Sequence, residues 1–334
     1  MARDVLVLRE DEIRALLDMA SCIDAVAAAF SSYSGGQAEL PAIIHLDIPE
    51  HAGEIHGKAG YIHGGSIYAA KFASGFPGNA AAGLPTSDGI VLAFDAATGA
   101  PAALLFDNGF ITDLRTGAAG GVAARYLAPQ GVETVAIIGT GAQARYQLDA
   151  LALERSFSEV RVWGRDEDKA RGCVDELSER PGLPHGCRYV VSPTVSEAVE
   201  GADVIITVTA AQEPLVFSDG IRRGAHVTAV GSDGPDKREL DTETLGRADL
   251  LVVDSRAQCA QRGELHHALE DLTVSSAGTA IELGEITAGA HPGRTSEDQT
   301  TVCDLTGVGV QDVAAAELVL WRAAEQGLGE RLSI

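Results

Sequence analysis

The sequence predicts an α/β protein in which a doubly wound parallel sheet is joined to a second, α+β domain. Short apolar runs alternate with helical stretches after Pro129, and a glycine turn follows the first of these runs. Earlier apolar runs are instead separated by Gly, Pro, Asn and Asp clusters. With 334 residues, 46% of them hydrophobic, the chain is long enough for two domains with substantial cores.

The first third of the chain predicts a helix and an antiparallel sheet. Apolar residues recur at helical spacing from about Arg9 to Tyr33, which predicts one core helix. Apolar runs at 67–70, 89–94 and 102–106, bounded by turn residues, predict strands of an antiparallel sheet. A helix rich in small residues is expected from about residue 112 to residue 127.

The middle of the chain has the alternation typical of βαβ units. Strands are predicted at 135–138, 160–163, 189–191, 204–207, 226–230 and 250–253. An apolar-periodic helix at about 308–328 is expected to return to the first domain. We therefore expect one domain from residues 1–127 and 308–334, and a second from residues 128–307.

The glycine turn after the first parallel strand predicts a dinucleotide site. Gly139 and Gly141, with Ala144 in the third small position, follow the pattern G-x-G-x-x-G/A. Glycine at these positions lets a pyrophosphate approach the backbone N–H groups that open the following helix. Because glycines also serve ordinary tight turns, the motif alone leaves both interpretations open.

The residues after the second parallel strand bear on the choice of dinucleotide. Gly164 and Arg165 follow this strand, where an acidic residue usually binds the adenosine ribose of NAD. A guanidinium pairs with phosphate bidentately, so Arg165 slightly favours NADP over NAD. A solvated Arg165, or an Asp166 that turns in to bind NAD, is the alternative.

Composition excludes several classes of function. A net charge of −23 argues against nucleic-acid binding, which needs a surplus of Lys and Arg. No apolar stretch approaches the roughly 20 residues that cross a bilayer, and the first residues lack the pattern of a secretory leader. Five scattered cysteines show no C-x-x-C spacing. We expect a cytoplasmic protein with reduced thiols and no membrane partner.

Later strand ends carry polar residues, at the edge where such a sheet binds ligands. Thr209 follows the fourth predicted strand, and Asp233 and Lys237 follow the fifth. Asp233 stands beside Gly234, so a turn residue and a catalytic carboxylate are equally good interpretations.

Several segments together resemble the ornithine cyclodeaminase/mu-crystallin family. They are Lys71 with 76–79, then 83–86, 114–116, 138–144, 231–233 with 237–240, 283–285 and 292–294. The resemblance covers the chain from about residue 40 to residue 312. It implies a homodimer whose first, α+β domain supplies the substrate residues and the dimer sheet, together with a Rossmann domain that binds NAD(P).

Members of this family handle the bond between the α-carbon and the nitrogen of an amino acid. The resemblance implies that Lys71 and Arg115 hold the α-carboxylate, and that Asp233, with Lys71, is catalytic. A guanidinium fork fixes a carboxylate in plane, and an acidic group can relay a proton to or from nitrogen. The residues that match or adjoin cofactor positions are Thr86, Arg115, Gly139, Gly141, Ala142, Gln143, Arg165, Thr209, Ala229, Gly231, Lys237 and Thr306.

Two departures from the cyclodeaminase pattern concern the substrate. The pattern has a glutamate about thirteen residues before the carboxylate-binding lysine, where this chain has Lys58. A cation there would repel an ornithine side chain, which favours an acidic or neutral substrate; an edge-strand lysine without a role is the alternative. An arginine usual near residue 41 is missing, and His45 is a candidate replacement. The chain is most similar to the ectoine-utilisation and iminosuccinate reductase-like branch.

These observations predict an NAD(P)-dependent imine reductase or amino-acid dehydrogenase acting on a small, acidic amino acid. A cyclodeaminase that releases ammonia and a mu-crystallin-like NADP-binding protein with little turnover are the alternatives. We expect no metal: His45, His51, His56 and His63 lack the spacing of ligands, and His266 and His267 are expected on a surface helix or a dimer edge.

Overall fold

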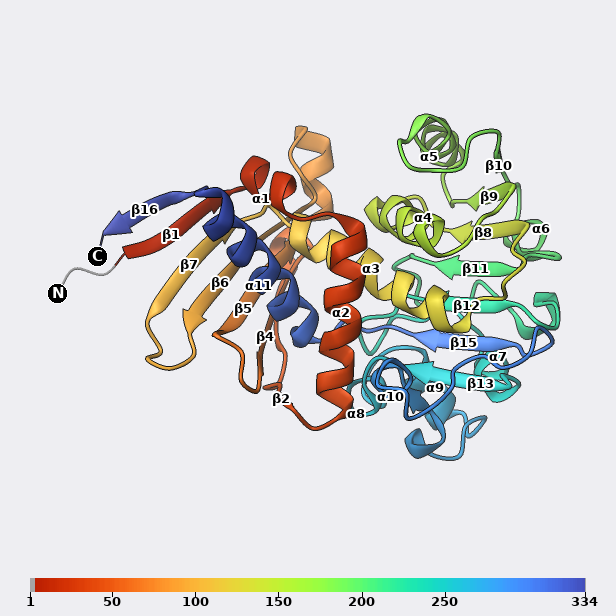
Figure 1. The fold of residues 1–334 in the computed structure, drawn as a ribbon. Coiled ribbons are helices and arrows are strands. Elements are labelled where there is room, and N and C mark those ends of the chain that lie inside the picture. Colours follow the sequence, from red (N-terminus) through yellow and green to blue (C-terminus); the bar gives the residue numbers. More distant parts are fainter. Residues whose placement is uncertain (1–3, 334) are drawn as a thin grey trace. The chain divides into compact units, whose positions relative to one another are not determined.

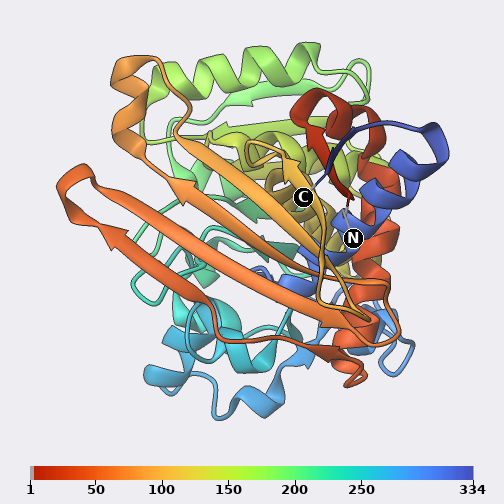
Figure 2. The same ribbon diagram turned by 90° about the vertical axis from the view of Figure 1, so that its left-hand side faces the viewer.

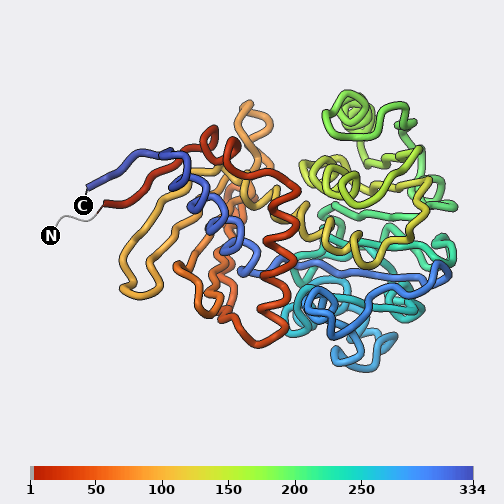
Figure 3. The backbone as a smooth tube through the Cα atoms, in the orientation of Figure 1, coloured from red at the N-terminus to blue at the C-terminus, as the bar shows by residue number. Residues whose placement is uncertain are grey.

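The computed structural model describes residues 4–333, and the chain divides into two compact units. Unit 1 consists of Met1–Arg115 with Val308–Ile334, and unit 2 of Thr116–Gly307. The expected boundary after residue 127 is the end of helix α3 (Phe110–Leu127), whereas the two units divide within that helix. Unit 1 therefore combines the N-terminal and C-terminal parts of the described residues (Figure 3).

Unit 1 is built on an eight-stranded sheet. Its order is β16-β1-β7-β6-β5-β4-β2, with β3 paired to β4, and its strands run antiparallel except where β1 meets β7. The strands are β1 (Asp4–Arg9), β2 (Ala38–Glu39), β3 (Ile44–Ile48), β4 (Gly53–Ile62), β5 (Ile67–Gly75), β6 (Ser87–Asp95), β7 (Pro101–Phe106) and β16 (Glu330–Ser333). The three predicted runs form β5, β6 and β7, while β1 and β16, which pair the two ends of the chain, were not predicted.

The helix predicted near the N-terminus is interrupted, so the expectation of a single helix is wrong. The chain forms α1 (Glu10–Leu16) and α2 (Met19–Ser34), separated by extended backbone at Leu17 and Asp18. The Asp18 side chain accepts a hydrogen bond from Ser21 N at 2.9 Å and caps α2. Both helices bury one apolar face, so the apolar spacing in the sequence continues across the break. The spacing therefore does not show that a new helix begins after Asp18.

Helices cover one face of the unit 1 sheet. The last helix, α11 (Gly309–Gln326), packs against α2 and against strands β4 and β5, as predicted for a return to the first domain (Figure 1). Ile67, Ala69 and Lys71 alternate along β5 and are buried on this face. Tyr68 and Phe72 point to the opposite face, which Figure 2 shows in front, with α2 and α11 behind the strands.

Unit 2 is a parallel sheet of eight strands in the order β10-β9-β8-β11-β12-β15-β13-β14. The strands are β8 (Thr134–Ile138), β9 (Glu159–Trp163), β10 (Arg188–Val191), β11 (Val204–Thr207), β12 (His226–Ala229), β13 (Leu250–Val253), β14 (Ile281–Glu282) and β15 (Thr301–Asp304). The six predicted strands are confirmed, and so is the α/β class. The short β14 and the inserted β15 were not predicted.

Both faces of the unit 2 sheet are buried. Val135 and Ile137 belong to one apolar core, and Ala136 and Ile138 to another, so the unbroken apolar run on β8 serves two sides. The helices are α4 (Ala142–Glu154), α5 (Glu167–Glu179), α6 (Val195–Val199), α7 (Thr242–Gly246), α8 (Arg256–Cys259), α9 (Glu264–Glu270) and α10 (Leu283–Thr287). Short 3-10 turns complete the chain at Pro49–His51, Pro77–Ala82, Ser218–Gly220 and Ala277–Thr279. Across residues 4–333 no helix has the length and apolar character that a bilayer crossing requires.

Candidate active site

The predicted dinucleotide turn joins β8 to α4 in unit 2. Gly139 has φ +126°, and a Cβ there would lie 2.7 Å from Val208 O, so the turn requires glycine. Gly141 is the N-cap of α4, so no side chain accepts a hydrogen bond from the first N–H groups of this helix. A Cβ built on Gly141 would meet nothing within 4 Å. The first N–H groups of α4 thus adjoin open space, which fits a bound pyrophosphate.

A cavity of about 330 Å³ adjoins this turn. Its lining residues are Gly139, Thr140, Gly141, Trp163, Gly164, Arg165, Val208, Thr209, Ala210, Ala211 and Leu215. The lining includes Arg165 and no carboxylate among the described residues. Asp166 instead caps α5, where its carboxylate accepts a hydrogen bond from Lys169 N at 3.1 Å. The cavity therefore presents a cation, not an acid, at the end of β9.

A buried glutamate that the sequence analysis did not single out organises the neighbouring strand ends. Glu239 accepts hydrogen bonds from Thr209 Oγ1 at 2.7 Å, Thr207 Oγ1 at 2.8 Å and Gly231 N at 2.8 Å, and a fourth from Thr209 N. It is fully buried, and its four donors come from the end of β11 and from the loops after β11 and β12. One carboxylate therefore fixes two loops at the ligand-binding edge of the sheet. Its position in the sequence, between Arg238 and Leu240, does not indicate this role.

The predicted catalytic residue Asp233 lies on the loop after β12. Its Oδ1 is 2.7 Å from the ammonium of Lys237, which lies four residues further on. Both side chains are partly exposed, and Ser232 Oγ bonds the carbonyl of Lys237. The structure thus brings two predicted residues into one ion pair, which fixes the orientation of the carboxylate.

Two of the predicted cofactor residues have no side chain available to a ligand. Ala229 is fully buried in β12. Thr306 is 2% exposed, and its hydroxyl donates to Asp254 Oδ1 at 3.0 Å and accepts from Gln258 Nε2 at 2.8 Å. Ala142 and Gln143, by contrast, lie in the first turn of α4 and are not buried. Any contact from Ala229 or Thr306 would have to come from the backbone.

Unit 1 contains the other predicted residues, including a buried pair of lysines. Lys58 on β4 and Lys71 on β5 are direct cross-strand partners, with 9% and 2% of their surface exposed. Like charges that face each other across two strands are destabilising, and burial increases the cost. The buried carboxylate of Asp312, on which both ammonium charges act, offsets part of this cost.

Arg115 on α3 lies in the same unit and is 3% exposed. Its Nε donates to Asp312 Oδ1 at 2.9 Å, and its Nη1 donates to Gln311 Oε1 at 3.1 Å. Asp312 and Gln311 belong to the first turn of α11, and no local pattern in the sequence indicates a role for either of them. They hold the plane of the guanidinium in one orientation.

Three cations act on Asp312. Burial opposes its ionisation, but the charges of Arg115, Lys71 and Lys58 outweigh burial and hold the pKa of the carboxyl below its usual value. Asp107, just before α3, is also close to this group: burial raises its pKa to about 6, and Lys71 partly opposes the rise. Lys58, Lys71 and Arg115 therefore form one electrostatic cluster.

His45 and Thr86 lie in unit 1 but are less enclosed. His45 is the cross-strand partner of His56, the two rings meet edge to face at 4.6 Å, and His45 Nε2 lies 3.0 Å from Asp47. Its side chain is 40% exposed, unlike the buried lysines. Thr86 is exposed before β6, and its carbonyl accepts from Phe76 N at 2.7 Å.

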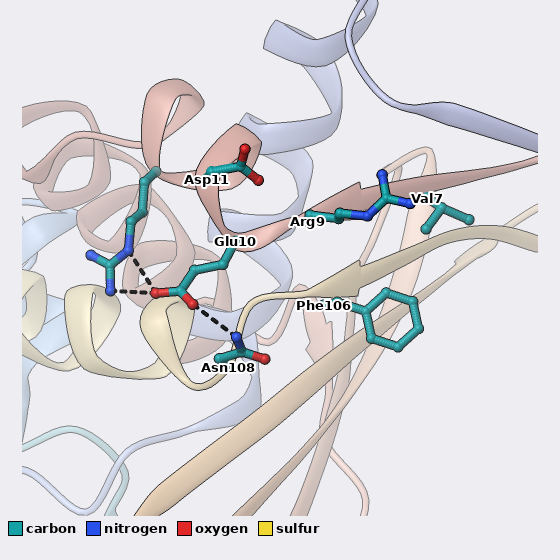
Figure 4. Close-up of a pocket in the computed structure, with 7 residues that line it drawn as sticks. Val7, Arg9, Glu10, Asp11, Phe106 and Asn108 are labelled. Carbon is teal, nitrogen blue, oxygen red and sulfur yellow. Dashed lines mark hydrogen bonds and ion pairs between the residues drawn. The ribbon is translucent and has the colours of Figure 1, made fainter. Parts of the chain in front are cut away.

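Another cavity in unit 1, of about 640 Å³, contains none of the predicted residues (Figure 4). Glu10 points toward Asn108 and accepts a hydrogen bond from its Nδ2 at 2.8 Å. It accepts another from Arg14 Nε at 2.7 Å. Glu10, Arg14 and Asn108 thus bind one another, and we assign this cavity no role.

The fold and the glycine turn define a Rossmann-type dinucleotide-binding protein. A family model for the ornithine cyclodeaminase/mu-crystallin family matches residues 3–327, and the chain belongs to that family. An uncharacterized cyclodeaminase of Sinorhizobium fredii is 40% identical over 97% of both chains.

Two solved structures extend the comparison. The Δ1-pyrroline-2-carboxylate reductase of Thermococcus litoralis, in complex with NADH and L-proline, is 33% identical over 98% of this chain and 100% of its own, with a TM-score of 0.91. The iminosuccinate reductase of Paracoccus denitrificans, in complex with NAD+, is 29% identical over 99% and 100%, with a TM-score of 0.87. The protein is an NAD(P)-dependent oxidoreductase that acts on amino or imino acids.

Proposed function

We propose that the protein reduces the imine of a small dicarboxylic acid to its amino acid, or catalyses the reverse oxidation. The iminosuccinate and aspartate pair is the substrate type. The observation that carries this proposal is the buried, cross-strand pair of Lys58 and Lys71, together with Arg115.

The charge of this cluster favours a dianion. Arg115, Lys71 and Lys58 are buried around Asp312, with Asp107 close by. Two unit charges about 4 Å apart interact by roughly 4 kcal/mol at an effective dielectric constant of 20. A substrate with two carboxylates offsets the repulsion between the lysines, whereas a substrate that carries an amine in its side chain would add to it.

Each residue then has a separate task. Arg115, held in plane by Asp312, and Lys71 bind the α-carboxylate, and Lys58 binds the second carboxylate. Asp233, oriented by Lys237, gives a proton to the substrate nitrogen or takes one from it. A bound nicotinamide cofactor supplies or accepts the hydride at the α-carbon.

We also propose that NADP is slightly preferred over NAD. Arg165 lines the cavity of unit 2 at the end of β9, and Asp166 is engaged as the cap of α5. The two solved relatives are bound to NADH and NAD+, so an NAD preference would mean that Arg165 is solvated. Titration with NADPH and NADH, for the wild type and for Arg165→Ala, decides between these outcomes.

The substrate is tested by consumption of NAD(P)H with iminosuccinate, formed in place from oxaloacetate and ammonia. Pyruvate and ammonia provide the matched imine without a second carboxylate. We expect kcat/KM to be higher with the dicarboxylate. Turnover with neutral keto acids and none with oxaloacetate would refute the proposal.

A variant series assigns the preference to Lys58. Loss of a close charge pair costs about 2 kcal/mol or more, so Lys58→Met should lower kcat/KM for the dicarboxylate roughly 30-fold. Turnover of the monocarboxylate should fall much less. Lys169→Met, at an exposed position on α5, is the matched control. Equal losses for both substrates would show that Lys58 does not select the second carboxylate.

The same assays separate the alternatives. Release of ammonia from ornithine or lysine without net change of the cofactor would indicate a cyclodeaminase, which the name of the Sinorhizobium fredii relative suggests. Cofactor binding without turnover of any amino or imino acid would indicate a mu-crystallin-like binding protein.

We propose a homodimer formed through the uncovered face of the unit 1 sheet. Large apolar side chains are exposed on its strands: Ile44 (49%), Leu46 (52%), Phe72 (37%) and Phe106 (44%). Exposed apolar side chains gathered on one sheet mark an interaction surface. Light scattering should give the mass of a dimer for the wild type and of a monomer for Leu46→Glu with Phe72→Glu. A monomeric wild type would contradict the proposal.

A further inference from the structure

Helix α9 carries two adjacent histidines and a glutamate whose ligand atoms converge. One ring nitrogen of His266, one of His267 and one carboxylate oxygen of Glu270 all lie within 4.8 Å of one another. In residues 4–333 no other group of three or more His, Cys, Asp or Glu side chains gathers in this way. The histidines are partly buried and Glu270 is exposed, so the group is accessible from solvent.

The hydrogen bonds of the two rings define which nitrogens carry lone pairs. His266 Nδ1 lies 3.3 Å from the carbonyl oxygen of Ala260, and His267 Nε2 lies 2.9 Å from that of Lys237. A carbonyl oxygen only accepts hydrogen bonds, so both of these nitrogens carry hydrogen. In a neutral imidazole this leaves His266 Nε2 and His267 Nδ1 as lone-pair donors. Metal-bound histidines usually have such a second partner on the other ring nitrogen.

The lone pair of His266 then faces an anion. His266 Nε2 is 3.5 Å from Glu270 Oε1, so the two atoms are close enough to bind one cation together. A proton would bridge only His266 and Glu270, whereas a metal ion would also accept the lone pair of His267 as a third ligand. We propose that His266 Nε2, His267 Nδ1 and the Glu270 carboxylate bind a divalent transition-metal ion, with water completing the shell. Two imidazoles and a carboxylate suit Zn²⁺.

The site is connected to the proposed acid–base residue. His267 bonds the carbonyl of Lys237, and the side chain of Lys237 pairs with Asp233. A metal ion on His267 would therefore restrain the loop that carries Asp233, without taking part in the reaction. This inference is independent of the substrate proposed above.

The test is a titration of the full chain with Zn²⁺ against a chelating indicator. We expect one ion per chain with a Kd in the micromolar range or below, and at least a tenfold weaker Kd for His266→Asn and for Glu270→Gln. Co²⁺, used as a spectroscopic probe, should give a ligand-field spectrum that both variants lose. Glu270 is exposed, so its variant is expected to fold even if His266→Asn does not.

Two control variants keep the inference refutable. His185→Asn and Cys187→Ser remove other metal-binding side chains of unit 2 and should leave the Kd unchanged. Absence of binding at micromolar Zn²⁺ would overturn the proposal. Binding that persists in Glu270→Gln and is lost in a control variant would overturn it as well.

Discussion

Asp304 offers a stability measurement that does not depend on knowing the substrate. It ends β15, is 1% exposed, and accepts a hydrogen bond from Leu265 N at 2.9 Å on Oδ2. Its Oδ1 is buried and has no hydrogen-bond partner in the described part of the chain. Burial, reinforced by the charge of Asp254, outweighs the Leu265 N–H and raises the pKa of Asp304 to about 8.

The sign of the pH dependence follows from this shift. An unfolded aspartate has a pKa of about 3.9, so between roughly pH 4 and pH 8 the folded protein holds a proton that the unfolded chain has released. Stability from this group is therefore fully present below about pH 4 and is lost as the pH rises toward 8. The loss is about 1.4 kcal/mol per pH unit, or roughly 3 kcal/mol between pH 5 and pH 7.

Asp304→Asn removes this dependence. The amide mimics the protonated carboxyl, and its oxygen still accepts from Leu265 N. Urea unfolding at pH 5, 6 and 7 should show the variant gaining about 1.4 kcal/mol per pH unit relative to the wild type. Trp163 reports on unit 2 when Trp321, in unit 1, is replaced by Phe in both proteins.

An exposed carboxylate of unit 2 supplies the control. Asp298→Asn should give an unfolding free energy that follows the wild type at every pH. If Asp304→Asn and the wild type also change in parallel between pH 5 and pH 7, Asp304 is ionised in the folded protein. The reasoning about its burial would then be wrong.

Three further changes test the other parts of the site. Glu239→Gln should lower the unfolding free energy by about 2 kcal/mol. Both carboxylate oxygens accept backbone N–H groups, so the NH2 of the new amide must face one of these donors. Urea unfolding that is unchanged from the wild type would contradict this. Gly139→Ala should lower the unfolding free energy by about 1–3 kcal/mol, because alanine is strained at φ +126° and its Cβ would lie 2.7 Å from Val208 O; urea unfolding that matches the wild type would contradict this. Arg115→Lys replaces the guanidinium that Asp312 holds in plane, and it should raise KM for the substrate about tenfold while the Kd of the cofactor is unchanged. A higher Kd for the cofactor would indicate that Arg115 binds the cofactor and not the substrate.

Local sequence patterns were sufficient to predict most strands of the parallel sheet of unit 2. Its strands are apolar on both faces, so the runs from 135–138 to 250–253 stand out in the sequence. The same patterns failed for strand β15, which lies between β12 and β13 although it follows both in the chain. Its order in the sheet depends on pairing with distant strands, and no local spacing records that pairing. The helix break at Asp18 was not predicted for a related reason, because the apolar spacing continues across it.

The residues of the candidate site divide in the same way. Local sequence was sufficient to predict the glycine turn, because the pattern lies within one short segment in which backbone geometry requires glycine at position 139. It also marked Lys58, Lys71, Arg115 and Asp233 through family resemblance.

How these groups are held can be seen only in the folded chain. Lys58 and Lys71 are thirteen residues apart in the sequence but directly opposite in the sheet, and Arg115 is oriented by Asp312, 197 residues away. The four donors to Glu239 likewise come from the ends of two neighbouring strands, β11 and β12, and the residues that follow them. Burial and pairing of charges are properties of the folded chain, because they depend on which distant segments exclude water from one another.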